Sequence, residues 1–196
     1  DEAGFEAEMA AQRERSRGDE TFGGESDNRV ATYAALGVES EFAGYESLTG
    51  TSTVTLLMGD GTTTERLESG DRGEVVLASS TFYSEGGGQI GDHGEVITPS
   101  GRFHVEDTQR FGDAIVHVGT VSEGSIVTSE AAESRVDPEF RQGSMRNHTA
   151  THLLHASLRD HLGTHVRQAG SYVGPDRLRF DYTHPEAPTR EQLRTI

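Results

Sequence analysis

The sequence lacks cysteine, tryptophan and lysine, and these absences narrow the possibilities. Without cysteine there are no disulfides, and no thiolate of this chain can bind a metal ion. The 17 basic residues are all arginine, which we interpret as a bias of composition rather than as part of a mechanism. No apolar run approaches the roughly 20 residues of a membrane-spanning helix, and no signal segment opens the sequence. We therefore expect a soluble, cytoplasmic protein with no membrane partner.

The charges are unevenly distributed along the 196 residues. Residues 1–140 carry 28 acidic residues and 9 arginines, whereas residues 141–196 carry 5 acidic residues, 8 arginines and six of the nine histidines. The net charge of −16 argues against a nucleic-acid partner, but a basic, histidine-rich end is still able to contact phosphates. An ordinary solvated acidic surface is the alternative interpretation.

Both ends of the sequence have the pattern of interrupted elements. Residues 1–17 have apolar residues at helical spacing and resemble the last turns of a helix cut from a longer chain. The polar, glycine-rich stretch 18–28 predicts a linker or disordered loop. Near the other end, Thr189 and Gln192 form a capping box that opens a helix just before the sequence stops. We expect a chain truncated at both ends.

Period-two alternation dominates between residues 42 and 140. Short apolar segments are separated by turn signals about every ten residues, which predicts a small antiparallel β-barrel. The turn 59–61 (Gly-Asp-Gly) predicts a tight hairpin. The expected strands are 52–57, 62–67, 73–77, 94–97, 102–107, 114–121, 125–127 and 134–137.

Three consecutive glycines, Gly86, Gly87 and Gly88, interrupt the barrel pattern. Three glycines do not stiffen a strand, so they predict a flexible loop or a place where the backbone approaches another group closely. Phosphate-loop chemistry is disfavoured, because no Gly-Lys-Ser/Thr follows and no helix begins there.

A histidine-bearing helix is predicted over residues 148–162. Asn147 is a suitable N-cap, and Gly163 is suited to end the helix. His148 and His152 lie one turn apart on one face, where two neutral imidazoles can bind a zinc ion. Ala150, Leu153, Leu154 and Leu158 are expected on the opposite, buried face. Two surface histidines are the plainer interpretation, and Thr149 stands where a zinc protease has its general-base glutamate.

A β-hairpin is predicted after this helix, from strands 166–173 and 177–182 with a Gly-Pro-Asp turn between them. Arg177 and Arg179 fall on one face of the second strand. The predicted fold class is α+β: a small antiparallel barrel over residues 28–142, and then a helix and hairpin over residues 143–196 that begin an incomplete α/β core. Residues 1–27 would form the entry helix and linker.

The sequence resembles the alanyl-tRNA synthetase family in its editing region. The resemblance rests on RNHTATHLLHASLRDHLGTHVRQAGSYVGPDRLRFDYTH at 146–184, TFYSEGGGQIGDHGEV at 81–96 and EDTQRFG at 106–112. Residues 4–17 also resemble the segment that enters this region. Threonyl-tRNA synthetases share the histidine pair, but the continuation after it is of the alanyl type. Gly86 departs from the family, where serine is more frequent.

The resemblance implies a parent enzyme that ligates alanine to tRNA(Ala) with ATP in a catalytic domain absent from this sequence. It implies that this region hydrolyses mischarged Ser-tRNA(Ala) and Gly-tRNA(Ala) at a zinc site. His148 and His152 match the first two zinc ligands, and the family's remaining ligands, a cysteine and a histidine, would lie beyond Ile196. We therefore expect no tightly held zinc and no activity in the isolated chain, whose partners would be the rest of the synthetase and the tRNA acceptor end.

Further site residues are predicted around the histidine pair. Thr151 and Gln168 match family positions that line the editing pocket, where they would bond the serine hydroxyl or the attacking water. Contacts to the tRNA acceptor end are predicted from charge alone for Arg146, Arg167, Arg177 and Arg179. The glycine loop 86–88 would close over the 3′ end of the tRNA. A second spaced pair, His161 and His165, is interrupted by Gly163, and we interpret it as structural.

Two other classes of protein stay open at this point. A free-standing trans-editing deacylase would have the same barrel and histidine pair, but it would begin near the barrel, without the segment 1–17. A non-catalytic tRNA-binding module is the second alternative.

Overall fold

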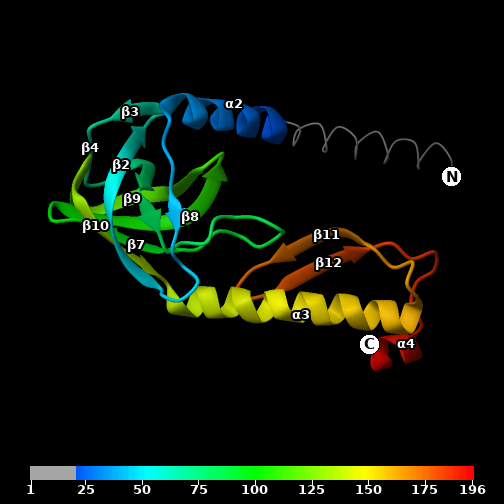
Figure 1. Ribbon diagram of the computed structural model, residues 1–196. Helices are drawn as coiled ribbons and strands as arrows, with labels where there is room; N and C mark the ends of the chain where they lie inside the picture. The colour runs from blue at the N-terminus through cyan, green and yellow to red at the C-terminus, as the bar shows by residue number, and fades with distance from the viewer. Residues whose placement is uncertain (1–20) are drawn as a thin grey trace.

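The computed structural model describes residues 21–196, with side chains described from residue 28 onward. Figure 1 shows a barrel at one end and a long helix with a hairpin at the other. The helices are α2 (Thr21–Leu36), α3 (Pro138–Leu162) and α4 (Arg190–Thr195). The strands are β1 (Glu41–Phe42), β2 (Thr49–Gly59), β3 (Thr62–Thr64), β4 (Arg66–Glu68), β5 (Arg72–Leu77), β6 (Ser79–Ser80), β7 (Gly94–Ile97), β8 (Gly101–Phe111), β9 (Ala114–Val127), β10 (Ala131–Val136), β11 (Gln168–Val173) and β12 (Leu178–Tyr182).

Six strands close into an antiparallel barrel, which confirms the predicted architecture. The order around the ring is β2, β5, β9, β8, β7 and β10, and β10 pairs back onto β2. Closure removes the unpaired edges that an open sheet would expose. The barrel therefore provides a rigid base for the loops that leave it.

The barrel interior is filled by alternating apolar side chains. Each fully buried large apolar side chain contributes about 1.5–3 kcal/mol relative to an exposed one. The principal members of this core are Val54, Leu57, Val75, Leu77, Phe82, Val96, Phe103, Val105, Val121 and Ile126. The period-two pattern of the sequence thus describes the inward face of each strand.

Two details of the barrel differ from the predicted strands. The expected strand 125–127 is the end of the long strand β9. The expected strand 62–67 divides into β3 and β4, because β3 pairs with β2 whereas β4 pairs with β9. The predicted hairpin turn is confirmed, with Asp60 at φ 51° and Gly61 at φ 75° as a primed turn requires.

Helix α2 occupies most of the predicted linker, so the linker prediction is wrong from Thr21 onward. Tertiary contacts outweigh the weak local helix propensity here. Tyr33 is buried and stacks on Phe111 with the ring centres 5.4 Å apart, while its hydroxyl and the Arg29 guanidinium both bond Glu74. The helix expected at residues 1–17 lies outside the described residues.

Helix α3 begins ten residues before the predicted start, so the assignment of Asn147 as N-cap is wrong. Asp137 is the N-cap, since its carboxylate accepts hydrogen bonds from the backbone of Glu139 and Phe140, and Pro138 follows at the first helical position. The predicted end at Leu162 with Gly163 is confirmed. The expected domain boundary at 142/143 therefore falls inside a continuous helix.

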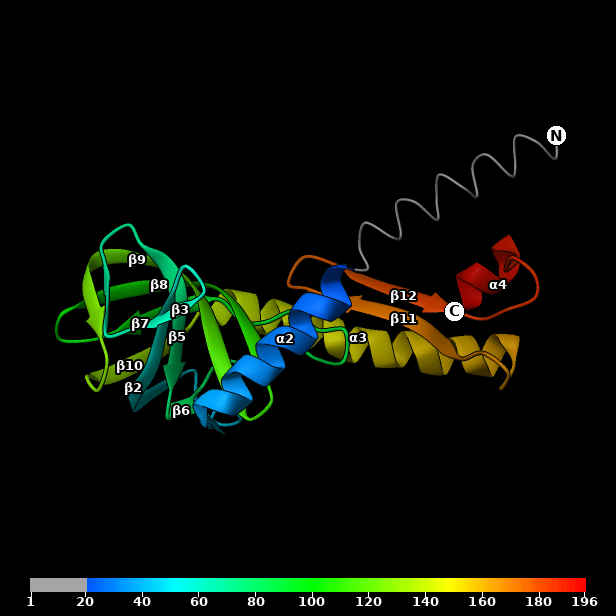
Figure 2. The ribbon, with the colours of Figure 1, turned by 90° about the horizontal axis from the view of Figure 1, so that it is seen from above.

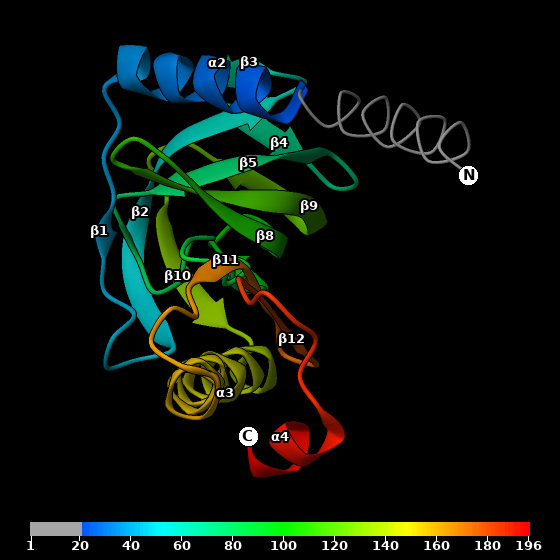
Figure 3. The same ribbon diagram turned by 90° about the vertical axis from the view of Figure 1, so that its right-hand side faces the viewer.

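The barrel lies between α2 and α3, as Figures 1 and 3 show from two directions. Figure 2 shows α3 running outward from the barrel with the β11–β12 hairpin beside it. This hairpin confirms the predicted pairing of 166–173 with 177–182. Helix α4 begins with the predicted capping box of Thr189 and Gln192. None of the helices within residues 21–196 is long and apolar enough to cross a lipid bilayer.

Candidate functional site

The two histidines predicted as metal ligands lie together on α3. The ring centres of His148 and His152 are 5.0 Å apart, with a 40° angle between the ring planes. Two imidazoles that share a tetrahedral zinc ion, with each nitrogen about 2.0–2.1 Å from the metal, have ring centres roughly 5 Å apart. His148 is half-buried and His152 is exposed, so the pair is accessible from outside. The spacing of the pair fits a shared divalent ion.

Gln89 holds the first of these rings. Its side-chain oxygen lies 2.7 Å from Nδ1 of His148, and Gln89 itself is buried. If Nδ1 donates to this oxygen, Nε2 carries the lone pair, which is the form of histidine that binds a metal ion. The sequence analysis did not single out Gln89, because nothing in the local pattern links it to a helix 59 residues away.

The glycine loop that carries Gln89 is joined to the hairpin. The backbone of Val173 donates to Gly88 at 2.7 Å, and the backbone of Ile90 donates to Val173 at 3.1 Å. Gly88 has φ +85°, and a Cβ added there would lie 2.8 Å from the carbonyl oxygen of Ser171. This is the close backbone approach that the triple glycine predicts, and the group approached is β11 of the same chain. The flexibility of the loop and its closure over RNA stay predictions.

A buried ion pair fixes α3 to the barrel. Nε of Arg141, in the first turn of α3, donates to Asp92 at 2.8 Å, and its terminal nitrogens also donate to Asp92 and to the backbone oxygens of Gly44 and Thr81. Asp92 is fully buried and also accepts from the backbone of Tyr83. Because Asp92 lies three residues after Gln89, the same contact fixes the glycine loop relative to the histidine helix.

Helix α3 is covered along a line that includes Ser144, Thr151 and Leu158, with His148 and His155 half-buried and His152 exposed, which corrects the expected burial of this helix. The ring of His155 lies 5.0 Å from that of Phe180, and its Nε2 is buried without a hydrogen-bond partner among the described residues. Leu158 is buried, but Leu153, expected in the core, is 67% exposed. The β11–β12 hairpin packs Phe180 against His155, so it covers part of the histidine face, while Leu153 on the predicted core face stays exposed.

Thr151 and Gln168, the two predicted pocket residues, lie on different elements. Thr151 is buried, and its hydroxyl donates to the Asn147 carbonyl at 2.8 Å within α3. This contact satisfies the hydroxyl proton but leaves its oxygen able to accept a hydrogen bond. Gln168 is exposed at the start of β11, where it pairs with Tyr182. The pocket roles of both residues stay predictions.

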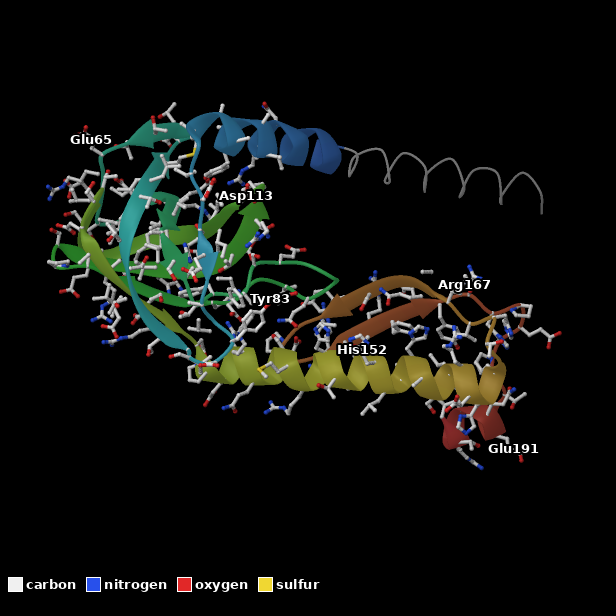
Figure 4. The ribbon with its side chains drawn as sticks, in the orientation of Figure 1. Glu65, Tyr83, Asp113, His152, Arg167 and Glu191 are labelled. Carbon is white, nitrogen blue, oxygen red and sulfur yellow. The ribbon has the colours of Figure 1, made fainter. Side chains whose placement is uncertain are left out.

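The four predicted RNA-contacting arginines are all exposed, and they come from three separate segments. Arg146 lies on α3, Arg167 precedes β11, and the other two belong to the hairpin. The guanidinium of Arg177 lies 5.3 Å from the ring centre of Tyr172. Arg179 pairs with Asp181 at 3.2 Å, which offsets part of its charge. Figure 4 shows Arg167 near one end of the hairpin and His152 at the middle of α3.

The remaining spaced pair, His161 and His165, makes two separate contacts, and its interpretation as structural stays a prediction. Nδ1 of His161 lies 2.9 Å from the Ser157 carbonyl. Nε2 of His165 lies 2.9 Å from Nδ1 of His184, so these two rings share one proton between them. Within residues 21–196, no three histidine, aspartate or glutamate side chains converge into a metal-binding group. A tetrahedral zinc site at His148 and His152 would therefore need donors from beyond the described part of the chain.

Comparison with known proteins adds an independent result. Residues 1–140 match the family model described as tRNA synthetases class II (A). Over all 196 residues the chain is 47% identical to the alanine–tRNA ligase of Halorhodospira halophila, 45% identical to that of Shewanella loihica and 44% identical to that of Pseudomonas savastanoi pv. phaseolicola. The chain spans 22% of the length of each of these relatives.

Proposed function

Since this chain belongs to the class II (A) tRNA synthetases, we propose that it is part of an alanine–tRNA ligase and forms the first half of that enzyme's editing site. The parent enzyme would ligate alanine to tRNA(Ala) with ATP in a part that lies outside these residues. The substrate of the editing site would be the ester that joins serine or glycine to the terminal ribose of tRNA(Ala). The family assignment supports the ligase, and the geometry of α3 supports the editing reaction.

A second, hydrolytic site is needed because one binding pocket cannot distinguish alanine well enough from glycine and serine. A pocket sized for alanine cannot strongly reject glycine, which is smaller, or serine, which adds only a hydroxyl. One methyl group in a pocket changes binding by about 1–3 kcal/mol, which is too little for accurate protein synthesis. Hydrolysis of the wrong ester at a separate site supplies the missing discrimination.

The observation that carries the proposal is the spacing of the His148 and His152 rings, 5.0 Å between centres, on an accessible stretch of α3. These two residues would hold a zinc ion together with donors supplied from outside this chain. When bound, zinc polarises a carbonyl and lowers the pKa of a coordinated water. The two histidines would hold and orient that ion.

The other residues of the chain would position the substrate. Gln89 fixes the ring of His148, and the Arg141–Asp92 pair keeps that ring in place relative to the barrel. The Thr151 hydroxyl oxygen and the Gln168 amide would bond the serine hydroxyl or the attacking water. Arg146, Arg167, Arg177 and Arg179 would contact phosphates of the acceptor end as exposed cations.

Hydrolysis of Ser-tRNA(Ala) by the complete gene product that contains this chain tests the proposal. We expect His152→Ala to slow hydrolysis at least a hundredfold, on the order of the loss seen when catalytic metal coordination is disturbed. His161→Ala is the matched control, because His161 is an exposed histidine on the same helix outside the pair. Equal rates for wild type and His152→Ala would remove the histidines from the reaction and favour a tRNA-binding module.

A further inference from the structure

An aromatic cavity adjoins the histidine pair and shares His148 with it. It has a volume of about 310 Å³ and is lined by Phe42, Tyr45, Tyr83, Met145, His148 and Thr149, among others. Its walls come from three separate segments: the end of β1 and the loop after it, the loop after β6, and the first half of α3. Figure 4 shows Tyr83 above the first half of α3.

The aromatic rings of this cavity are arranged at one of its walls. Phe42 contacts Tyr45 edge to face, with ring centres 4.9 Å apart, and contacts Tyr83 in the same manner at 6.4 Å. Tyr45 is nevertheless 89% exposed, and Met145, which lines the cavity from α3, is 57% exposed. Exposed aromatic and thioether side chains that gather around a cavity are typical of a surface that binds a ligand. A surface without a binding role seldom exposes such a cluster to water.

The electrostatics of the cavity favour a neutral ring over a phosphate. The Arg141 guanidinium reaches the cavity wall, but its charge is matched by the buried carboxylate of Asp92. Hydrogen-bonding groups at the wall are uncharged: the Gln89 amide and the Thr149 hydroxyl. Aromatic faces bind flat rings by stacking, and uncharged polar groups bind the polar edge of such a ring. The cavity is therefore suited to a flat, neutral ring with polar edges.

The size and place of the cavity identify which ring that is. Serine and glycine side chains are far too small to fill an aromatic-lined space of about 310 Å³. His148 lies in the wall of this cavity, so its occupant touches a residue of the histidine pair. The ester proposed as substrate sits on the ribose of the last nucleotide, and the base nearest to that ester is therefore the one attached to the same ribose.

We propose that the cavity between Phe42, Tyr45, Tyr83 and Met145 binds the terminal nucleobase of a single-stranded RNA 3′ end by stacking. This inference rests on the proposed editing function, which supplies the ester beside His148. Tyr45 supplies the exposed ring face, and Phe42 supports Tyr45 from behind. Arg146, exposed on α3 next to Met145, supplies positive charge near the rim for the adjoining phosphate.

The test is equilibrium binding of two probes, adenosine 5′-monophosphate and the RNA tetranucleotide ACCA, to the 196-residue chain. Backbone amide chemical shifts of the ¹⁵N-labelled chain report binding, so the readout does not depend on the tyrosine that is replaced. We expect saturable shifts with wild type and an equal Kd with Tyr45→Phe, which keeps the ring. Tyr45→Ala should raise the Kd at least about fivefold, since stacking of one base contributes 1–3 kcal/mol.

Leu153→Ala is the matched control, because Leu153 is an exposed apolar side chain of α3 outside the cavity and should leave the Kd unchanged. An unchanged Kd for Tyr45→Ala, or no saturable binding to wild type at 20 mM nucleotide, overturns the proposal. A third result also overturns it: in the complete gene product, Tyr45→Ala lowers the Tm but leaves the affinity for ACCA unchanged. A segment of the parent chain, and not RNA, would then fill the cavity.

Neither probe carries an aminoacyl ester, and neither experiment needs a metal, so the outcome is independent of the hydrolysis of Ser-tRNA(Ala). A protein that binds ACCA through Tyr45 but does not hydrolyse Ser-tRNA(Ala) contradicts the editing function. A protein that hydrolyses it normally, with binding unaffected by Tyr45→Ala, contradicts the base-binding cavity.

Discussion

The Nδ1 atom of His148 lies 2.7 Å from the side-chain oxygen of Gln89, so a barrel loop orients a ring on α3. A histidine ligand commonly donates its second ring N–H to an oxygen, which fixes both the tautomer and the direction of the metal-binding nitrogen. Gln89 is in the right place to do this for His148. The contact joins the glycine-rich motif and the histidine motif, which are far apart in the sequence, into one site.

Replacing Gln89 should change the tautomer of His148. In the ¹⁵N-labelled, metal-free chain we expect His148 to carry its proton on Nδ1, and Gln89→Leu should shift the proton toward Nε2. Long-range ¹H–¹⁵N correlation spectra distinguish the two forms. Gln142→Leu, an exposed glutamine in the same helix, should have no effect. A wild-type His148 protonated on Nε2 would show that Gln89 donates to the ring instead of accepting from it.

The Arg141–Asp92 pair should be costly to break. Asp92 is fully buried, so Arg141→Ala leaves an uncompensated carboxylate and should lower the free energy of unfolding by about 3–5 kcal/mol. Urea titration measures the loss. Combining Arg141→Met with Asp92→Asn should recover part of it, because no charge then stays buried. Arg135→Ala, which breaks the exposed pair with Glu133, is the control and should change stability little.

Gly88 and Gly87 should respond differently to alanine. Both have positive φ, +85° and +61°, so each alanine carries a backbone cost of about 1–2 kcal/mol. At Gly87 nothing lies within 4 Å of the added Cβ, whereas at Gly88 it meets Ser171 at 2.8 Å. Gly88→Ala should therefore destabilise more than Gly87→Ala and should weaken hydrogen-exchange protection of the Val173 amide, which bonds Gly88. Equal effects at the two positions would mean that the loop is not held against β11.

His117 should make stability depend on pH. Burial inside the barrel lowers the pKa of this histidine from 6.5 to about 4, and its neutral ring bonds the Val75 carbonyl and the Ser80 hydroxyl. The unfolded chain takes up a proton below pH 6.5, which the folded protein resists. The contribution is therefore complete above pH 6.5 and is lost as the pH falls toward 4, by about 3 kcal/mol in total.

His117→Gln supplies the comparison, because glutamine can bond the same two partners without titrating. From pH 7 to pH 4 the unfolding free energy of wild type should fall by about 3 kcal/mol relative to that of this variant. A difference that stays constant over that range would show that His117 does not titrate below its ordinary pKa. Ring resonances of wild-type His117 that stay unchanged down to about pH 5 would, in contrast, support the lowered pKa without a variant.

The barrel could be predicted because its signals are local. Inward and outward residues alternate along each strand, and turns such as Asp60-Gly61 carry their own backbone preference. The start of α3 could not be located in this way, because Gly143 within the helix weakened the pattern. The structure gives the reason for that glycine: a Cβ at Gly143 would lie 2.7 Å from the Pro175 carbonyl. A long-range contact thus determines a residue that looks unfavourable locally.

The candidate site was likewise predictable only where its residues are close in the sequence. His148 and His152 could be paired from their spacing, since residues four apart on a helix are neighbours. Gln89 could not be linked to the histidines, because its contact with His148 is made far along the chain. The covered face of α3 could not be predicted either, because both leucines and histidines are able to pack against a neighbouring element. Tyr45 carried no signal in the sequence at all. Its place beside the site depends on how a loop from the barrel returns over α3.

The central claim is that His148 and His152 hold one metal ion together, and zinc titration of the ¹⁵N-labelled chain tests it most directly. Binding should be weak, because a stable zinc site needs three or four ligands and the pair would supply two. We predict that the ring nitrogens of both residues shift along one saturation curve, and that His148→Ala abolishes the shift at His152 while His161 stays unaffected. Independent curves for the two rings, or a His152 response that survives His148→Ala, would contradict the claim.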